Sequence, residues 1–478
     1  MFTTTELFGK FHSPKAPLRR ARQKLQGAAP QELEQLFGPC LPLGLLSQTE
    51  EGPNSRNRVY SVCVTFWAFL WQTLNGAPCR SAVRKVMAWF ALRGLQPVSE
   101  DDSPYCQARR RLDRDTLQRA LHSSAQAAEQ RAAQPWRFHQ KEVLVADGTM
   151  SSAADTSANQ RAFPQSKRQK PGCGFPLVRW VALFSLATGA LLEVAIGNKH
   201  RSELKLLRTI WDCLKAGMIL LADRGFCDFV TIATLLSRQV DSVMRLNGSR
   251  PHDFRRGKRL GKGDRLVVWQ KPPRQTRTAT QKLWSRLPGQ IQLRLIRWRV
   301  SIPGFRAREL FLVTTLLDPV AYPPADLAAL YLRRWRVELF LRDIKTTLGI
   351  DNLACKTPKM LAHELMMHLI GYNLIRCLMV EAAATCGVEL ERISFKGSVD
   401  TLHHFSLVIA AARSRKQRLQ LTNAMLAALA GDLLPERPNR VEPRCCKRRR
   451  KAYPFMVKPR KKLQARILRG KKGKYPRR

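Results

Sequence analysis

The sequence predicts an α/β protein in which helical regions lie on either side of a central sheet. From residue 141 onward, short aliphatic and β-branched runs alternate with helical stretches, which is the pattern of a sheet covered by helices. Residues 1–140 have a helical pattern instead, as do stretches near 358–383 and 416–434. With 478 residues and 44% hydrophobic content, the chain is long enough for more than one packed domain.

The individual elements follow from periodicity and turn signals. In the first 140 residues, helices are expected at Val59–Leu74, Ser81–Leu92 and Asp113–Arg131. Further helices are expected at Ser202–Lys215 and Phe229–Arg238, and a long one begins near Pro323 and can run to Gly349. The strand candidates are Val143–Ala146, Leu177–Leu186, Leu191–Ile196, Met218–Ala222, Ser242–Leu246, Arg265–Gln270, Gln290–Ile302 and Phe311–Leu317.

The charge of the chain points to a polyanionic partner. Lys and Arg number 83 against 36 Asp and Glu, a formal net charge of +47, and such a surplus causes self-repulsion unless a polyanion offsets it. Ribosome-associated and membrane-surface proteins can also be very basic, but they are rarely this long with Trp and Phe throughout. Nucleic acid is therefore the expected partner. The tail from Arg440 has 18 Lys or Arg and one acid, Glu442, so it is expected to be poorly ordered when free.

The cysteines and the apolar stretches exclude other classes. The 12 cysteines contain no C-x-x-C pair and no Cys/His cluster with zinc-ligand spacing, so neither a zinc ribbon nor a zinc finger is expected. The first ten residues lack a secretory pattern, and Val59–Leu74 is too short to cross a bilayer comfortably. We expect a cytoplasmic, nucleoid-associated protein with no membrane contact.

Two acids follow buried strand candidates. Asp147 comes directly after Val143–Ala146, and Asp223 comes directly after the apolar run that ends at Ala222. Such an acid is either a turn or capping residue or part of a site, and an Asp-Gly pair after a strand is more often a turn. The position of either acid alone does not show whether it is a turn residue or part of a site.

The predicted long helix carries a third acid on a polar stripe. Tyr331, Arg334, Glu338 and Lys345 are spaced by three, four and seven residues, so they project to one side of a continuous helix. An ordinary charged surface would explain the cations and the acid but gives no reason for the tyrosine. The stripe is therefore expected to face something specific.

The pattern Y-x2-R-x3-E-x6-K formed by these four residues resembles the signature of bacterial DDE transposases of insertion sequence family 4. The segments around both aspartates are similar to that family as well, as are Gly172–Pro176 and Tyr372–Arg376. The likeness spans about 100–380. It implies a ribonuclease-H-like catalytic core in which Asp147 and Asp223 come from strands and Glu338 from the late helix.

The resemblance also implies a domain plan and a reaction. The enzyme would cut DNA at the ends of an insertion sequence and join them to target DNA, as a homodimer on double-stranded DNA with terminal inverted repeats. The expected parts are a helical DNA-binding domain at 1–140, the first part of the core at 141–247, a basic β-rich insertion at 248–310, the last part of the core at 311–383, a helical region at 384–439 and a disordered basic tail at 440–478.

The chemistry of the expected site requires cations. Three carboxylates brought together repel one another unless cations neutralise them, and hard Mg²⁺ or Mn²⁺ prefers such oxygen ligands. Two ions, held by Asp147, Asp223 and Glu338, would activate the attacking oxygen and stabilise the leaving one. Arg334 and Tyr331 are expected to bind phosphates near the cleaved bond, and Lys345 a phosphate further along.

Further DNA contacts are expected outside the helix. Arg297 and Trp298 lie on a strand with one basic face, and Trp269, Trp284 and Trp298 are candidates to stack on a flipped base, with burial in a small sheet as the alternative. In the loop Lys167–Lys170, Lys167 and Arg168 are phosphate candidates or ordinary solvated side chains.

Two other functions stay open at this point. One is a ribonuclease-H-like nuclease, or a domesticated relative, that nicks DNA without strand transfer. The other is a non-catalytic, basic DNA-binding protein whose carboxylates are structural, although simple binding gains nothing from Glu338 among the cations.

Overall fold

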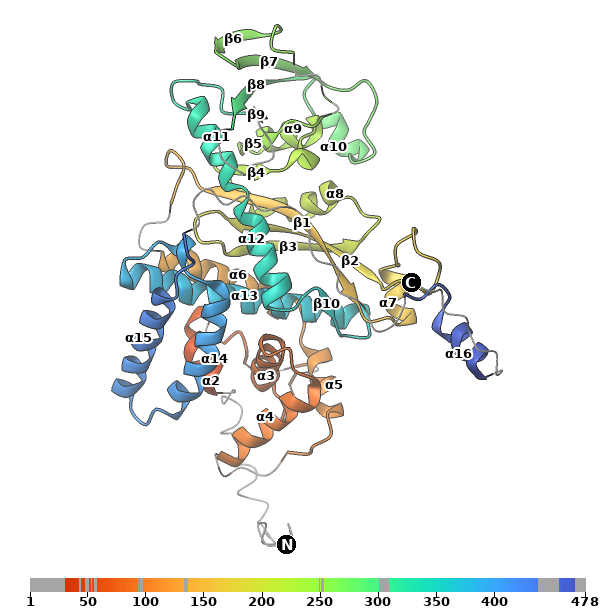
Figure 1. The fold of residues 1–478 in the computed structure, drawn as a ribbon, viewed down its shortest axis with the longest axis vertical. Coiled ribbons are helices and arrows are strands. Elements are labelled where there is room, and N and C mark those ends of the chain that lie inside the picture. Colours follow the sequence, from red (N-terminus) through yellow and green to blue (C-terminus); the bar gives the residue numbers. More distant parts are fainter. Residues whose placement is uncertain are drawn as a thin grey trace.

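A large mixed β-sheet runs through the middle of the molecule (Figure 1). The structure is a computed structural model, and it describes residues 31–436 and 455–468 except 43, 48–50, 53, 56–57, 93, 95–97, 133–135, 249, 251–252 and 301–308. The strands are β1 Val143–Ala153, β2 Leu177–Ser185, β3 Leu191–Asn198, β4 Ile219–Ala222, β5 Asp241–Arg245, β6 Lys258–Gly261, β7 Asp264–Gln270, β8 Gln290–Arg299, β9 Glu309–Thr314 and β10 Asn352–Leu353.

The sheet has the order β3-β2-β1-β4-β5-β9-β8-β7-β6, and the short β10 pairs with the far end of β1. β1 is antiparallel to β2 and parallel to β4, and β4 is parallel to β5. The expectation of an α/β fold is therefore confirmed.

Helices cover both faces of this sheet and extend from its lower half (Figure 1). The described α-helices are α2 Gln31–Phe37, α3 Val62–Leu74, α4 Cys79–Leu92, α5 Ser103–Arg111, α6 Arg114–Arg131, α7 Ser157–Ala162, α8 Glu203–Leu207, α9 Phe229–Ser237, α10 Gln281–Arg286, α11 Pro324–Arg333, α12 Arg336–Arg342, α13 Pro358–Cys386, α14 Phe395–Ala411, α15 Arg415–Gly431 and α16 Arg460–Leu468. The expected helix Ser202–Lys215 is instead the short α8 followed by a 3-10 turn over Arg208–Cys213, and α14 was not predicted.

β1 is buried on both faces, which its sequence explains. Val143 and Val145 belong to one hydrophobic core, whereas Leu144 and Ala146 belong to a second core on the opposite face. A strand with apolar residues at consecutive positions is typical of a sheet that is covered on both sides. β1 is therefore the central strand from which the neighbouring functional residues take their positions.

The strands of the predicted insertion do not form a separate small sheet. β8 pairs with β9, and β9 pairs with β5, so β6 to β8 extend the central sheet at one edge. The alternating pattern of β8 fits this arrangement, because Ile291, Leu293 and Leu295 face the second core. The small sheet that was expected around the tryptophans is therefore the edge of the central sheet.

A buried ion pair ties this extension to the start of α11. Arg294 on β8 donates from Nε to Asp264 Oδ1 at 2.8 Å and from Nη2 to Asp264 Oδ2 at 2.6 Å, and both side chains are almost fully buried. Arg294 Nη1 also donates to the carbonyl oxygen of Tyr322 at 2.7 Å. One side chain thus fixes β7 and the loop that leads into α11.

The central helix α13 holds the β2–β3 turn in place. Asn373 Oδ1 accepts from the Leu191 backbone N–H at 2.8 Å, and its amide donates to the Leu191 carbonyl oxygen at 2.8 Å. Tyr372 donates to the carbonyl oxygen of Gly189 at 2.8 Å, and Arg376 Nε to that of Thr188 at 2.9 Å. The segment Tyr372–Arg376, singled out in the sequence analysis, thus binds the backbone of the β2–β3 turn.

α13 is long and apolar enough to cross a membrane by length and composition, but 78% of its most apolar window is buried inside the protein. It packs against α6, α15 and α3. Its hydrophobic character is accounted for by its position in the core.

Part of the basic tail departs from its prediction. Residues 460–468 form α16, so the prediction of a disordered tail was wrong for this segment, which is rich in the helix formers Lys, Leu, Gln, Ala and Arg. The tail at 440–454 and 469–478 lies outside the described residues.

Candidate active site

Asp147 and Asp223 lie on neighbouring strands. β1 and β4 are parallel, and their last paired residues are Val145 and Leu221. Continuing this register by two residues places Asp147 opposite Asp223, at a strand spacing of roughly 4.8 Å. The prediction that both acids sit at the ends of strands needs one correction. β1 continues through Asp147 because it still pairs with β2, so only the β4 side of β1 is free there.

Strand alternation directs both aspartates to the same face of the sheet. Val143 and Val145 precede Asp147 by four and two residues, and Ile219 and Leu221 precede Asp223 in the same way; all four belong to the larger core. Asp223 keeps an extended backbone, with φ −75° and ψ 170°, and its side chain does not cap the following turn. Its carboxylate therefore does not serve as a helix cap.

Glu338 reaches this face from α12. The helix packs against β1, and its residues Val337, Phe340 and Leu341 join the same core as the odd-numbered residues of the two strands. Glu338 is on the first turn of α12, and its side chain is 39% exposed. Figure 1 shows α12 lying across β1. Three chain segments thus bring one acid each to one side of the sheet.

Arg334 lies among the three acids. Its Nη2 donates to Glu338 Oε1 at 3.3 Å, and its pKa, lowered by burial, is raised overall by the charges of nearby Tyr331, Asp223, Asp147 and Glu338. Within the described residues, the three carboxylates are not all within 4.8 Å of one another. The guanidinium supplies part of the positive charge that the acids require.

Tyr331 is buried beside this arginine. It is only 5% exposed, Arg334 lies 5.7 Å from its ring centroid, and its hydroxyl has no hydrogen-bond partner in the described part of the chain. Burial, together with the charge of Asp223, raises its pKa well above the usual range. The tyrosine therefore stays a neutral donor next to the acids.

Asp147 has the most perturbed carboxyl group of the three. Its pKa is raised to about 6, chiefly by burial and also by the charges of Glu203 and Glu338, while the Gly148 backbone N–H and Arg334 oppose the shift. The Gly148 N–H donates to Asp147 Oδ1 at 2.8 Å. A carboxylate in this environment gains from any added cation.

The long helix predicted from Pro323 to Gly349 is not continuous. Between α11 and α12, the backbone N–H groups of Arg334, Trp335, Val337 and Glu338 each bond to the carbonyl three residues earlier, which tightens the helix into a 3-10 turn. After Arg342, residues 343–347 form a π-helical turn. The prediction that Tyr331, Arg334, Glu338 and Lys345 lie on one stripe of a continuous helix is therefore only partly correct.

Lys345 lies on the π-helical turn, away from the acids. Its Nζ forms an ion pair with Asp351 Oδ1 at 3.0 Å. Because the π-turn winds more slowly than an α-helix, the direction of Lys345 differs from the one that helical periodicity predicts.

Glu203 is a neighbour of the site that the sequence did not indicate. A Cβ atom added at Gly148 would lie 2.6 Å from Glu203 Cδ, so the glutamate covers the strand next to Asp147. It also pairs with Arg179 at 3.8 Å. A glycine inside a strand is the one signal that could have indicated such a close approach, but Asp147-Gly148 resembles a turn in sequence.

Replacing Asp147 with Asn is expected to stabilise the chelator-treated protein at neutral pH. The pKa of Asp147 in the folded protein is about 6, above the ordinary value of 3.8. Ionisation of Asp147 therefore lowers the stability of the fold as the pH rises from 3.8 to about 6. After discounting for partial exposure, the gain at pH 8 is about 1–2 kcal/mol, and it shrinks below about pH 5. Chemical unfolding in EDTA tests this. An equal gain at pH 4 and pH 8 would contradict it.

Replacing Glu203 with Gln is expected to shift the acid limb of the pH–activity profile to lower pH. The substitution removes a negative charge that raises the pKa of Asp147, so Asp147 ionises more readily. Cleavage rates across the acid range measure this shift. Asp212, whose side chain is 99% exposed, provides the control D212N, and an identical shift in both variants would contradict the expectation.

The tryptophans of the sheet extension are partly buried. Trp298 packs against the larger core, and Trp269 and Trp284 pack against the second core. Arg250 lies 3.9 Å from the Trp269 ring centroid, and Lys271 lies 4.9 Å from that of Trp284. This arrangement agrees with the burial alternative.

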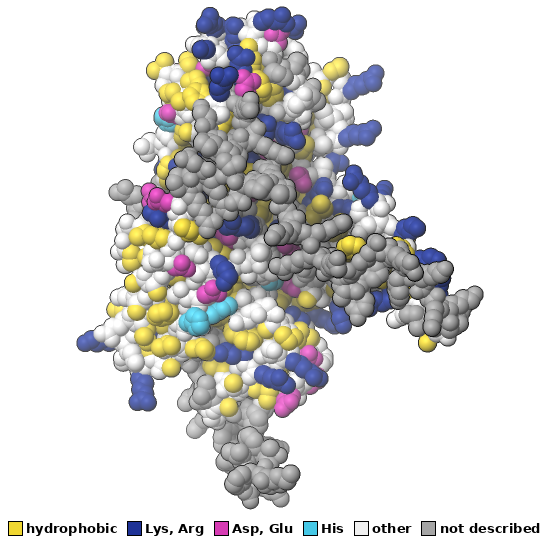
Figure 2. All heavy atoms as spheres, viewed as in Figure 1, with side chains coloured by type: hydrophobic (Ala, Val, Ile, Leu, Met, Phe, Trp, Pro, Cys, Tyr) yellow, Lys and Arg dark blue, Asp and Glu magenta, His cyan; other side chains and the backbone are white. Residues whose placement is uncertain are grey.

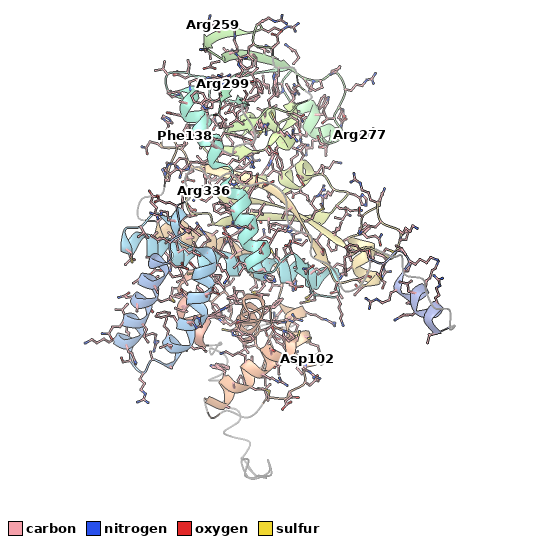
Figure 3. All side chains as sticks on the ribbon, in the orientation of Figure 1. Asp102, Phe138, Arg259, Arg277, Arg299 and Arg336 are labelled. Atoms are coloured by element: carbon pink, nitrogen blue, oxygen red, sulfur yellow. The ribbon has the colours of Figure 1, made fainter. Side chains whose placement is uncertain are left out.

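The remaining basic candidates are exposed. Arg297 is exposed on β8 with its guanidinium 5.3 Å from the Phe254 ring centroid, and Lys167 and Arg168 are exposed in the loop after α7. Figure 2 shows Lys and Arg side chains gathered at the upper end of the molecule and along one side of the view. Arg259, Arg277 and Arg299, labelled in Figure 3, all lie on the sheet extension.

Comparison with known proteins identifies the family. A family model described as "Transposase DDE domain" matches residues 138–374. The transposase InsG for insertion sequence element IS4 of Escherichia coli (strain K12) is 27% identical over 369 residues, which cover 74% of this chain and 78% of that relative. A solved piggyBac transposase synaptic complex with hairpin DNA has a TM-score of 0.40 at 10% identity, covering 87% of this chain and 86% of that one. These matches support a DDE transposase of the insertion sequence 4 type, with DNA transposition as its function.

Proposed function

We propose that Asp147, Asp223 and Glu338 form the active site at which this transposase cleaves the ends of its insertion sequence and joins them to target DNA. The observation that carries this assignment is the convergence of the three acids on one face of the sheet. The β1–β4 register, which ends at the pair of Val145 with Leu221, supports this proposal because alternation directs Asp147 and Asp223 to one face, and α12, which carries Glu338, packs against β1. The core strands β3-β2-β1-β4-β5, with the first three antiparallel and the last three parallel, support a ribonuclease-H-like core.

The donor set suits hard divalent cations, which DDE transposases generally use. The three acids offer only oxygen ligands, and burial with two neighbouring acids makes ionised Asp147 costly without further positive charge. We infer that the ions are Mg²⁺ or Mn²⁺ and number two. When bound, such ions activate the attacking oxygen and stabilise the leaving oxygen of a phosphodiester.

The cationic and phenolic neighbours have separate roles. Arg334 balances the acids in the free protein, and its planar guanidinium is suited to turn onto a phosphate beside the cleaved bond. Tyr331, with an unpartnered hydroxyl, can donate to a second phosphate oxygen. Lys345 is held by Asp351 and must exchange that partner for a phosphate further along the DNA.

Exposed basic side chains extend the DNA contact away from the acids. Arg297, Lys167 and Arg168 are assigned to phosphates, which position the duplex without reading its sequence. Trp298 is assigned a DNA contact only through the part of its ring that remains exposed, because the rest packs on the core. Two transposon ends must be handled together, so the enzyme is assigned as a homodimer on double-stranded DNA with inverted repeats, acting in the cytoplasm at the nucleoid.

The reaction is tested with DNA that flanks the coding region. A duplex of this flanking sequence, incubated with the protein and Mg²⁺, is expected to be cut at the element's end and then joined to a plasmid target. EDTA is expected to abolish both products. Tight binding without any cutting in Mg²⁺ or Mn²⁺ would reject the assignment of this chain as a competent transposase.

A further inference from the structure

Two thiols and a carboxylate meet in the amino-terminal helical region. Cys79 is the first residue of α4, Asp102 directly precedes α5, and Cys106 lies one turn into α5. Their ligand atoms all lie within 4.8 Å of one another, the one such group of His, Cys, Asp or Glu within the described ranges. Figure 3 labels Asp102 in this region, well away from the sheet extension. We propose that Cys79, Asp102 and Cys106 bind a Zn²⁺ ion.

Asp102 is available as a ligand because it does not cap its helix. An Asp at this position ordinarily accepts a hydrogen bond from a backbone N–H of the first helical turn. Here Asp102 has φ −86° and ψ −6°, and its side chain makes no capping bond. The carboxylate approaches the two sulfur atoms instead, which is unfavourable for anionic groups unless a cation joins them.

Buried donors support the sulfur atoms from the protein side. Arg109 is 8% exposed, and its Nη2 lies 3.2 Å from Cys79 Sγ and 3.8 Å from Cys106 Sγ; Gln72 Nε2 donates to Cys79 Sγ at 3.6 Å. Such donors orient metal ligands, and with a divalent ion Arg109 balances the charge of two thiolates and a carboxylate.

A second observation comes from the cavity onto which this cluster opens. The cavity has a volume of about 680 Å³, and its lining also includes Cys355 and His368, which lie within the family-matched residues 138–374. His368 is only 8% exposed, yet its Nδ1 has no hydrogen-bond partner in the part of the chain that the structure describes. A buried, unpartnered imidazole that lines the same cavity indicates a polar occupant.

The ligand types favour zinc over the other occupants. Thiolates are soft ligands that Zn²⁺ accepts and Mg²⁺ avoids, and Zn²⁺ also takes a carboxylate oxygen. A disulfide between Cys79 and Cys106 would use both thiols but would leave the approach of Asp102 unexplained. The site was not predictable from the sequence, because its ligands are separated by 22 and 3 intervening residues and follow no finger or ribbon spacing.

The site would join two parts of the molecule. Cys79 and Cys106 fix α4 to α5, and the cavity borders Gly349 and Asn352, which follow the helix that carries Glu338. Ion binding to the folded chain stabilises it by mass action. The ion would thus tie α4 to α5 beside the segment that follows the helix of Glu338.

Zinc binding by the full-length, reduced protein tests the proposal, with excess Mg²⁺ present to occupy the carboxylate site. We expect about one Zn²⁺ per chain by elemental analysis, and a Co²⁺-loaded form with a thiolate-to-metal charge-transfer band. Replacing Cys106 with Ser is expected to weaken Zn²⁺ binding by more than the roughly 10–100-fold that loss of an outer partner costs. Cys386, exposed at the end of α13, provides the control C386S, which should bind as the wild type does.

Thiol alkylation of the wild-type protein provides a second test that does not depend on the folding of C106S. Zn²⁺ is expected to protect Cys79 and Cys106 from alkylation but to leave Cys386 reactive. Equal alkylation of all three with and without Zn²⁺, or a Cys79–Cys106 disulfide as the stable form of the protein, would overturn the proposal.

Discussion

Replacing Glu338 with Gln is expected to lower the rate of DNA cleavage by at least about 1000-fold, comparable with the loss of a principal electrostatic stabiliser in other enzymes. The amide keeps the shape of the side chain and removes the negative charge that α12 brings to the aspartates. Affinity for DNA is expected to stay the same or to rise slightly, because an acid among cations is lost. Single-turnover cleavage and DNA binding are measured at one salt concentration.

Glu391 provides a matched control for this variant. Its side chain is 46% exposed against 39% for Glu338, and it pairs with Arg333 and with Arg336, which flank the same helical turn. The variant E391Q is expected to cleave at a rate within a factor of about 3 of the wild type, because Gln keeps an oxygen that can accept from Arg333 and Arg336 and the site loses no carboxylate ligand. Equal losses in E338Q and E391Q would mean that disturbing the helix, and not removing a metal ligand, lowers the rate.

Replacing Arg294 with Ala is expected to lower the free energy of unfolding by about 3–5 kcal/mol, because it leaves the Asp264 carboxylate buried without its partner. The change also removes the hydrogen bonds that Arg294 Nη1 donates to the carbonyl oxygens of Asp318 and Tyr322. The start of α11, and with it Tyr331, loses an anchor. Denaturant unfolding gives the free energy, and cleavage under stabilising conditions measures the effect on the site.

The exposed pair of Arg255 with Asp253 is the control for the buried one. Arg255 is 92% exposed and donates to Asp253 from Nε at 3.0 Å. Its replacement with Ala is expected to leave the denaturant midpoint close to that of the wild type, because solvent screens an exposed ion pair. A loss of under about 1 kcal/mol in R294A would contradict the view that the buried ion pair secures the sheet extension.

The acids were predictable because strand position and chain order carry the information. Asp147 and Asp223 each follow a short apolar run. The two runs pair as parallel neighbouring strands, which brings the two acids together. The extent of β1 beyond Asp147 was not predictable, because it depends on antiparallel pairing with β2 more than 30 residues away in places. Local pattern alone therefore favoured a turn at Asp147-Gly148.

The long helix shows where periodicity alone is insufficient. No Gly or Pro occurs from Ala325 to Arg342, so nothing local predicts the tightened turn at Arg334–Trp335 or the π-turn after Arg342. Packing of Val337 and Phe340 on the core fixes these changes. The direction of Lys345 depends on them and could not be read from its spacing to Glu338.

Contacts between distant segments were the least predictable features. Glu203 approaches Asp147 across the strand only because Gly148 lacks a side chain, and Cys79 meets Asp102 and Cys106 only because α4 and α5 pack together. The alternating pattern of β8 was predicted correctly, but the sequence could not tell which sheet it joins. Such pairings are decided by tertiary packing, which no local pattern encodes.

Binding of Mn²⁺ to the wild type and to D147N, D223N and E338Q, followed by electron paramagnetic resonance, tests the convergence of the three acids most directly. Each single substitution is expected to weaken Mn²⁺ binding by at least about 10-fold, because each removes one charged ligand from a shared site. Wild-type Mn²⁺ affinity in any one of the three variants would contradict the account, since that acid would then lie outside the site.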